Sequence, residues 1–176
     1  DTYEEGKSLT LGIDYKKEKF DDINRYFEFK LGKVFRDSYE ELIPNSSTIN
    51  KKNSNLFGSI KSNINEMFNF DYQYSINNGF DKIEYNSLTA QLDMGFFSTK
   101  MQFLEQNGVV GDSNTLKNSF TYNIDEKNFL TFETRRNRKI NLTEYYDLVY
   151  EYKNDCLIAG FKYKKTYYQD RDLRPT

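Results

Sequence analysis

One cysteine and one short basic run are the residues of this 176-residue chain whose chemistry could define a site. Cys156 is the only cysteine, and a lone thiol either packs as a small hydrophobic side chain or pairs with a second thiol. The basic run is Arg135, Arg136, Arg138 and Lys139. Arginine binds phosphate through a planar fork of donors. A nucleic-acid patch is not favoured, because the run is short and the net charge of the chain is −2.

The other polar motifs are weak, and the chain lacks the residues of common catalytic sites. Asp170 and Asp172 could bind a cation, but an Asp-x-Asp pair needs further ligands, and the Arg36-Asp37 pair is ordinary for a strand end. The sequence contains no histidine, which excludes Ser-His-Asp and Cys-His catalysis and histidine-based zinc sites within this chain. No glycine-rich phosphate loop is present. We therefore predict no enzymatic activity, no cofactor and no metal site.

Strands with one apolar and one polar face are the elements that must position these residues. In residues 66–77, apolar Phe68, Phe70, Tyr72, Tyr74 and Ile76 alternate with polar Asn69, Asp71, Gln73, Ser75 and Asn77. Strict alternation predicts a strand. The pattern recurs, so that Leu148 and Tyr150 oppose Asp147 and Glu151. It predicts about ten strands, at roughly 7–17, 24–36, 55–64, 67–77, 81–97, 98–106, 115–124, 128–138, 143–153 and 156–168.

Composition favours a membrane β-barrel over a soluble fold. Only 37% of the residues are hydrophobic, although 17% are aromatic, and the mean hydropathy is −0.86. This leaves little apolar sequence for a second packed layer, whereas barrel strands need an apolar residue only at every second position. No window approaches the roughly 18 apolar residues of a membrane helix. The alternatives are a soluble β-sandwich or jellyroll binding module, which would bury the apolar faces, and a diffusion porin.

The connections are predicted to alternate in length, as they do in outer-membrane barrels. Residues 65–66, 97–98, 125–127 and 154–155 are short, whereas 37–54, 107–114 and 139–142 are longer. Two connections break the pattern: 18–23 is long where a short turn is expected, and 77–80 is short. Short turns are periplasmic in such barrels, which places Cys156 on that side and Arg135, Arg136 and Arg138 outside. The run is then either a solvated loop or a contact for lipid A or core phosphates.

The C-terminal residues 141–163, which read NLTEYYDLVYEYKNDCLIAGFKY, resemble the end of the barrel of the outer-membrane LPS-assembly family LptD (OstA), in its alphaproteobacterial form. A second match is Val34-Phe35-Arg36-Asp37, followed by Ile43-Pro44, Lys51 and Ser54. The family has a Gly-Leu turn where Ser47-Thr48-Ile49 stands here, and an Asp where Asn55 stands. The departures bear on the shape of loop 37–54.

The resemblance implies that residues 1–176 are a single region, the C-terminal part of a larger barrel that lacks only its closing strand. Such a barrel is integral to the outer membrane of Gram-negative cells and has an N-terminal periplasmic jellyroll. It receives lipopolysaccharide from a periplasmic bridge of the LptA type and delivers it to the outer leaflet, with the lipoprotein LptE as a plug in its lumen. The expected activity is therefore lipopolysaccharide transport, without catalysis.

The same resemblance gives Cys156 a role. In the family, a cysteine pair at this place forms disulfides with the jellyroll, whereas this chain has one cysteine followed by Leu157. The periplasm is oxidising, and the parity of Cys156 with Lys162 and Lys164 predicts that it points into the lumen. We therefore expect a disulfide between Cys156 and a cysteine outside this chain.

Overall fold

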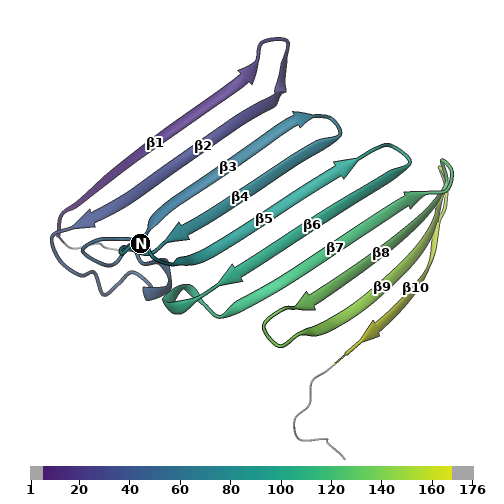
Figure 1. Cartoon of the computed structure of the whole chain (residues 1–176). Helices are drawn as coiled ribbons and strands as arrows, with labels where there is room; N and C mark the ends of the chain where they lie inside the picture. Colours follow the sequence, from purple (N-terminus) through teal and green to yellow (C-terminus); the bar gives the residue numbers. More distant parts are fainter. Residues whose placement is uncertain (1–5, 168–176) are drawn as a thin grey trace, which may run out of the picture.

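The computed structural model describes residues 6–167, which form one antiparallel sheet. Its ten strands follow one another in chain order, each hydrogen-bonded to its neighbours (Figure 1). The predicted all-β, antiparallel fold is confirmed. The strands are β1 (Ser8–Lys19), β2 (Asp22–Arg36), β3 (Leu56–Asn65), β4 (Phe68–Ile76), β5 (Ile83–Asp93), β6 (Phe97–Gln106), β7 (Ser113–Asn123), β8 (Asn128–Asn137), β9 (Leu142–Lys153) and β10 (Ile158–Thr166).

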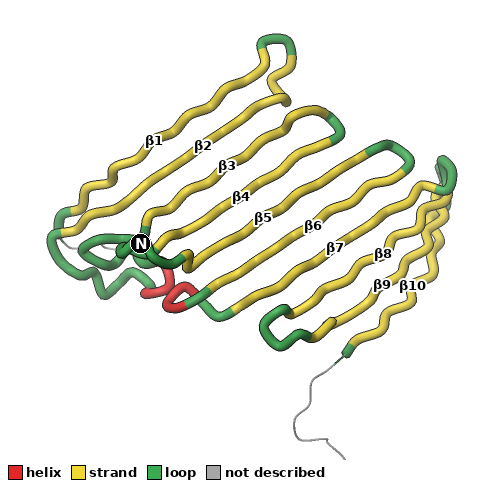
Figure 2. Tube along the Cα trace, in the orientation of Figure 1, coloured by secondary structure: helices red, strands yellow, loops and turns green. Residues whose placement is uncertain are grey.

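Helical structure is limited to two short 3-10 turns, η1 (Asn45–Ser47) and η2 (Gly108–Val110), drawn in red in Figure 2. Among residues 6–167 there is no helix with the length and apolar character needed to span a membrane. The strands β1 and β10 are the two edges of the sheet (Figure 1), which is open between them over the described residues.

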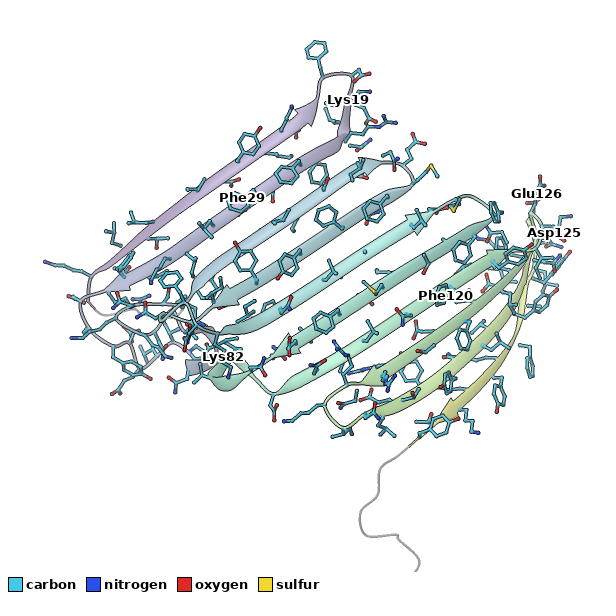
Figure 3. All side chains as sticks on the ribbon, viewed as in Figure 1. Lys19, Phe29, Lys82, Phe120, Asp125 and Glu126 are labelled. Atoms are coloured by element: carbon cyan, nitrogen blue, oxygen red, sulfur yellow. The ribbon has the colours of Figure 1, made fainter. Side chains whose placement is uncertain are left out.

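The connections lie on two opposite rims of the sheet. The short-turn rim consists of residues 20–21, 66–67, 94–96, 124–127 and 154–157, and the long-loop rim consists of 37–55, 77–82, 107–112 and 138–141. Lys19, Asp125 and Glu126 mark the first rim in Figure 3, and Lys82 marks the second. The predicted alternation holds, although loop 138–141 is no longer than turn 124–127.

Several predicted boundaries are wrong. The connection expected at 18–23 is the two-residue turn 20–21, because β1 and β2 pair as far as Lys19 and Asp22. The connection at 77–80 extends to residue 82. The junction expected at 97–98 lies at 94–96, where Gly95 has a φ of +81°. There the Met94 N–H donates to the Phe97 carbonyl over 2.8 Å, and flanking apolar residues conceal this turn in the sequence.

The register places most of the apolar strand residues on one face. Directly paired residues of neighbouring strands point to the same side of a sheet, and the pairing carries this face without interruption from β1 to β10. We call it the apolar face; it includes Leu9, Leu11, Ile13 and Tyr15 (β1), Phe27, Phe29 and Leu31 (β2), Ile60 (β3), Phe68, Phe70, Tyr72 and Tyr74 (β4), Leu88 and Leu92 (β5), Phe97, Met101 and Phe103 (β6), Leu116, Phe120 and Tyr122 (β7), Leu130 and Phe132 (β8), Tyr146, Leu148 and Tyr150 (β9) and Phe161 and Tyr163 (β10). The opposite side, with Asp71, Gln73, Asp147 and Glu151, is the polar face.

Nothing packs on the apolar face within residues 6–167. Leu148 is 38% exposed in mid-strand, and Ile43, in a loop, is the only buried hydrophobic residue of the described part. Rings such as Phe29 and Phe120 lie on a single curved layer (Figure 3). A β-sandwich would place these side chains between two sheets, and these residues form one sheet only.

Candidate functional site

The polar face carries ion pairs between neighbouring strands. Lys30 Nζ lies 3.4 Å from Asp14 Oδ2, joining β2 to β1, and Lys61 Nζ lies 3.3 Å from Asp71 Oδ2, joining β3 to β4. All four side chains are more than a third exposed, so each pair contributes at most about 1 kcal/mol. Their effect is to give this face both signs of charge and many donors and acceptors.

A denser polar cluster spans β7 to β10 on the same face. Glu133 accepts a hydrogen bond from the Tyr145 hydroxyl over 2.7 Å and forms an ion pair with Lys117 Nζ at 3.0 Å. Asp147, paired directly with Glu133 across β8 and β9, forms an ion pair with Lys162 Nζ at 2.9 Å. Asp147 is buried, and its other oxygen, Oδ1, has no partner in the described structure. The two carboxylates are thus held between two lysines.

The most buried residues of the structure lie in the loop 37–55, not on the strands. We call residues 37–55 the in-folded segment. Thr48, Asn50 and Ser54 are fully buried, and Ile43 and Asn55 are nearly so. The segment folds against the long-loop rim, with η1 beside η2 (Figure 2).

Polar contacts anchor the in-folded segment to the sheet. Ser54 Oγ accepts from the Val34 N–H over 2.8 Å. Asn55 Nδ2 donates to Ser75 Oγ over 3.0 Å and to Glu84 Oε2 over 2.7 Å. The Arg36 Nε donates to the carbonyl of Ile49 over 2.7 Å. The segment is therefore attached to β2, β4 and β5, and is part of the folded structure.

A hollow of about 1150 Å³ lies between the in-folded segment and strands β1–β4. Its walls include polar-face residues such as Lys30, Lys61 and Gln73, and its other side is formed by Ser46 and Ile49 of the segment. It is large enough for a polar group of several sugar or phosphate units, since ordinary ligand pockets measure about 300–1,000 Å³.

The structure divides the basic run between the two faces. Arg135 lies on the polar face, where its Nε is 2.9 Å from Glu144 Oε2. Arg136 lies on the apolar face beside Leu116 and donates from Nη2 to Asn141 Oδ1. The Arg138 guanidinium lies over the Phe103 ring, 5.3 Å from its centroid. Lys139 forms an ion pair with Asp112. The three arginines therefore do not all lie on one face of the sheet.

Cys156 lies in the short turn 154–157, is exposed and is a free thiol. The Asn154 side-chain oxygen accepts from the N–H groups of Cys156 and Leu157, over 3.0 and 2.8 Å. Because β10 begins only at Ile158, Cys156 lies in the turn and not in a strand. The strand alternation from which we predicted a side chain pointing into the lumen therefore does not apply to it. A hollow of about 820 Å³ adjoins it, walled by Phe129, Lys153 and neighbouring residues.

The remaining candidates do not form a site in the described residues. The Asp37 carboxylate accepts from the Lys7 N–H over 3.1 Å, and this bond lowers the pKa of Asp37. Asp170 and Asp172 lie outside the described residues. Within residues 6–167, no three side chains of the types that bind metals are grouped together.

The in-folded segment is the feature that sequence reasoning missed. Its length was predicted, but its burial on the polar side was not, because the segment is rich in Asn, Ser and Lys and reads as a solvated loop. The run Leu42-Ile43-Pro44 and the isolated apolar Ile49 were the available signal.

Comparison with known proteins adds no relationship: no family model matches the chain, and no curated protein matches it.

Proposed function

We propose that this chain is part of the wall of an outer-membrane β-barrel of the LptD (OstA) type, and that the intact protein moves lipopolysaccharide to the outer leaflet. The observation that carries the membrane part is the uninterrupted apolar face, which no second layer covers in residues 6–167. The lipopolysaccharide part is carried by the resemblance of residues 141–163.

The dimensions and chemistry of the sheet support a membrane position. The strands are 9 to 15 residues long, and a tilted barrel strand needs about 9–11 residues to cross the hydrocarbon layer. Lipid would contact the apolar face. The polar face, with its paired charges and the hollow beside the in-folded segment, would line the lumen and accept the sugar and phosphate part of the lipid.

Orientation follows from the two rims. In outer-membrane barrels the short turns are periplasmic, so the turn containing Cys156 would face the N-terminal domain and the LptA-type bridge. A disulfide from Cys156 to that domain would hold it under the lumen, and LptE would occupy the lumen itself. Cys156 is exposed in this structure, as such a bond requires. In non-reducing gels of the intact protein, Cys156→Ser should abolish or alter a mobility shift; an alkylatable Cys156 in mature protein would contradict the disulfide.

The transport function is tested by photo-crosslinking to lipopolysaccharide in cells. A photoreactive residue at Gln73, on the polar face beside the hollow, should capture lipopolysaccharide in transit, and capture should stop when the periplasmic supply is depleted. Glu151, on the same face but far from the hollow, serves as the comparison. Capture that is independent of supply, or normal surface lipopolysaccharide after depletion of the protein, would contradict the proposal. The mechanism we propose involves passage without a chemical step.

A diffusion porin is the second candidate, and the in-folded segment is the observation that favours it. A loop folded against the polar face narrows a channel and sets the size of the solutes that pass. A porin would conduct small ions steadily in planar bilayers and would leave surface lipopolysaccharide unchanged on depletion. These two readouts separate the functions.

A further inference from the structure

The two faces of the basic run carry different chemistry. Arg135, on the polar face, is paired with Glu144, and Lys139 is paired with Asp112. Within residues 6–167, no ion pair joins Arg136 or Arg138 to a carboxylate, and both side chains are exposed. Glu105, an acid on the same face, accepts from Asn114 Nδ2 over 3.1 Å. Two positive charges therefore remain unneutralised.

Arg136 and Arg138 lie away from the other cations of the apolar face. Those cations are on strands at or next to the two edges of the sheet: Lys17 of β1, Lys33 of β2 and Lys165 of β10. Arg136 is the only cation on the apolar side of strands β3 to β9. Arg138 follows it just beyond the end of β8, where its N–H donates to the Asn114 carbonyl and its guanidinium lies over Phe103, so both arginines are at the long-loop rim. Residues two apart in an extended chain are roughly 6.6 Å apart, so two arginine side chains can converge on one anion. A cation at the edge of an apolar surface is complementary to a lipid, whose acyl chains are apolar and whose phosphate is anionic.

Phe103 holds one of the two arginines in position. The Arg138 guanidinium lies over the ring of Phe103, 5.3 Å from its centroid. This contact occupies the flat face of the guanidinium. The five N–H donors lie in the guanidinium plane and stay available. Arg136 donates one N–H of its guanidinium to Asn141 Oδ1, and its other N–H groups can still bind a ligand.

We propose that Arg136 and Arg138, supported by Phe103, bind the phosphate of a glycolipid headgroup in the leaflet around the long-loop rim. The ligand is a resident lipid of the membrane, not the molecule in transit, and Arg135 takes no part. The site rests on the proposed membrane position of the apolar face, and it needs no transport activity.

The test measures binding of lipid A that carries two phosphomonoesters to the intact detergent-solubilised protein, by native mass spectrometry. Arg136→Gln/Arg138→Gln should weaken binding about tenfold or more, since a hydrogen bond to a charged group is worth at least that factor. Arg135→Gln/Lys139→Gln removes the same charge from the same run and should change binding by less than about twofold. The variant Arg136→Lys/Arg138→Lys keeps the charge and should retain most of the binding.

The same glycolipid after removal of its phosphates is the second probe, and it should not distinguish the variants. Four results would each overturn the site. The first three are no binding of lipid A by the wild type, equal binding by all variants, and equal weakening of binding by both glutamine pairs. The fourth is a difference between the variants that persists with the dephosphorylated glycolipid. Surface lipopolysaccharide is measured separately. Surface lipopolysaccharide that stays normal after depletion of the protein, with the binding difference retained, would refute the proposed function alone. Equal binding by all variants, with surface lipopolysaccharide lost on depletion, would refute the site alone.

Discussion

Asn55 Nδ2 lies 2.7 Å from Glu84 Oε2 and joins the end of the in-folded segment to the start of β5. The same amide also donates to Ser75 Oγ of β4. Ser75 is itself buried, so these groups depend on one another for hydrogen bonds. The contact explains how a loop rich in polar residues stays against the sheet.

Asn55→Ala should loosen the in-folded segment. The change leaves Ser75 Oγ and Glu84 without this donor, and an unsatisfied buried polar group costs about 1–3 kcal/mol. Trypsin should then cut at Lys51 and Lys52 faster than in the wild type. Asn53→Ala, at an exposed position two residues earlier, is the control and should leave cleavage unchanged; equal rates for both variants would contradict the anchoring role.

Gly58 of β3 lies under the ring of Tyr74, its direct partner on β4. A Cβ at Gly58 would stand 2.2 Å from Tyr74 Cζ, so Gly58→Ala must displace the ring, and we expect a cost of about 1–2 kcal/mol in unfolding free energy. Gly32→Ala should be tolerated, because its Cβ would meet only the Leu11 carbonyl at 3.8 Å. Urea titrations of both variants, alone and combined with Tyr74→Ala, test this; additive effects at Gly58 and Tyr74 would rule it out.

Asp125 should make the stability of the β7–β8 turn depend on pH. Its carboxylate accepts from the N–H groups of Lys127 and Asn128, over 2.8 and 2.9 Å, and from the Asn128 side chain. The Lys127 bond is the largest cause of its lowered pKa. A carboxyl with a lowered folded-state pKa stabilises the fold above its unfolded pKa of about 3.9, and this contribution is lost as the pH falls through the folded-state value.

Asp125→Asn should therefore be less stable than the wild type at neutral pH, and the difference should shrink below about pH 4. Urea unfolding from neutral pH down to about pH 3 measures it. Glu126→Gln, in the same turn, removes a carboxylate that makes no hydrogen bond to the described residues, and should show no such trend. A constant difference for Asp125→Asn across this range would contradict the assignment.

Leu88 and Thr89 are adjacent in the middle of β5 but lie on opposite faces. Leu88→Arg places a charge on the apolar face and should cost about 2–4 kcal/mol near the centre of a bilayer. Thr89→Arg puts the same side chain on the polar face, opposite Asp71, and should cost much less. Folding titrations in lipid vesicles compare the two; similar costs would mean that both faces meet the same environment.

The fold could be predicted from the sequence because strand alternation is a local pattern. Phe70, Tyr72 and Tyr74 lie on one face because successive side chains of a strand point to opposite sides. Turn positions were less predictable. Gly95 is enclosed by Met94 and Phe96, and this apolar run continues the strand pattern through the turn.

The candidate site could be predicted only in part, because its geometry depends on contacts between distant residues. Arg135 and Arg136 are neighbours in the sequence, and strand alternation predicts that they lie on opposite faces. Their surroundings are not local: Glu144 pairs with Arg135 on the polar face, and Phe103 packs against Arg138 on the apolar face. The burial of Asn55 depends on Ser75 and Glu84, which no local pattern connects to it.

The central claim is that lipid covers the apolar face, and site-specific photo-crosslinking along β4 tests it most directly. A benzophenone side chain is placed in turn at Phe70, Asp71, Tyr72 and Gln73 of the intact protein, in membranes that contain a labelled phospholipid. We predict labelling with a period of two: strong at Phe70 and Tyr72, weak at Asp71 and Gln73. Uniformly weak labelling, or a crosslink from Tyr72 to another part of the protein in place of lipid, would contradict the account.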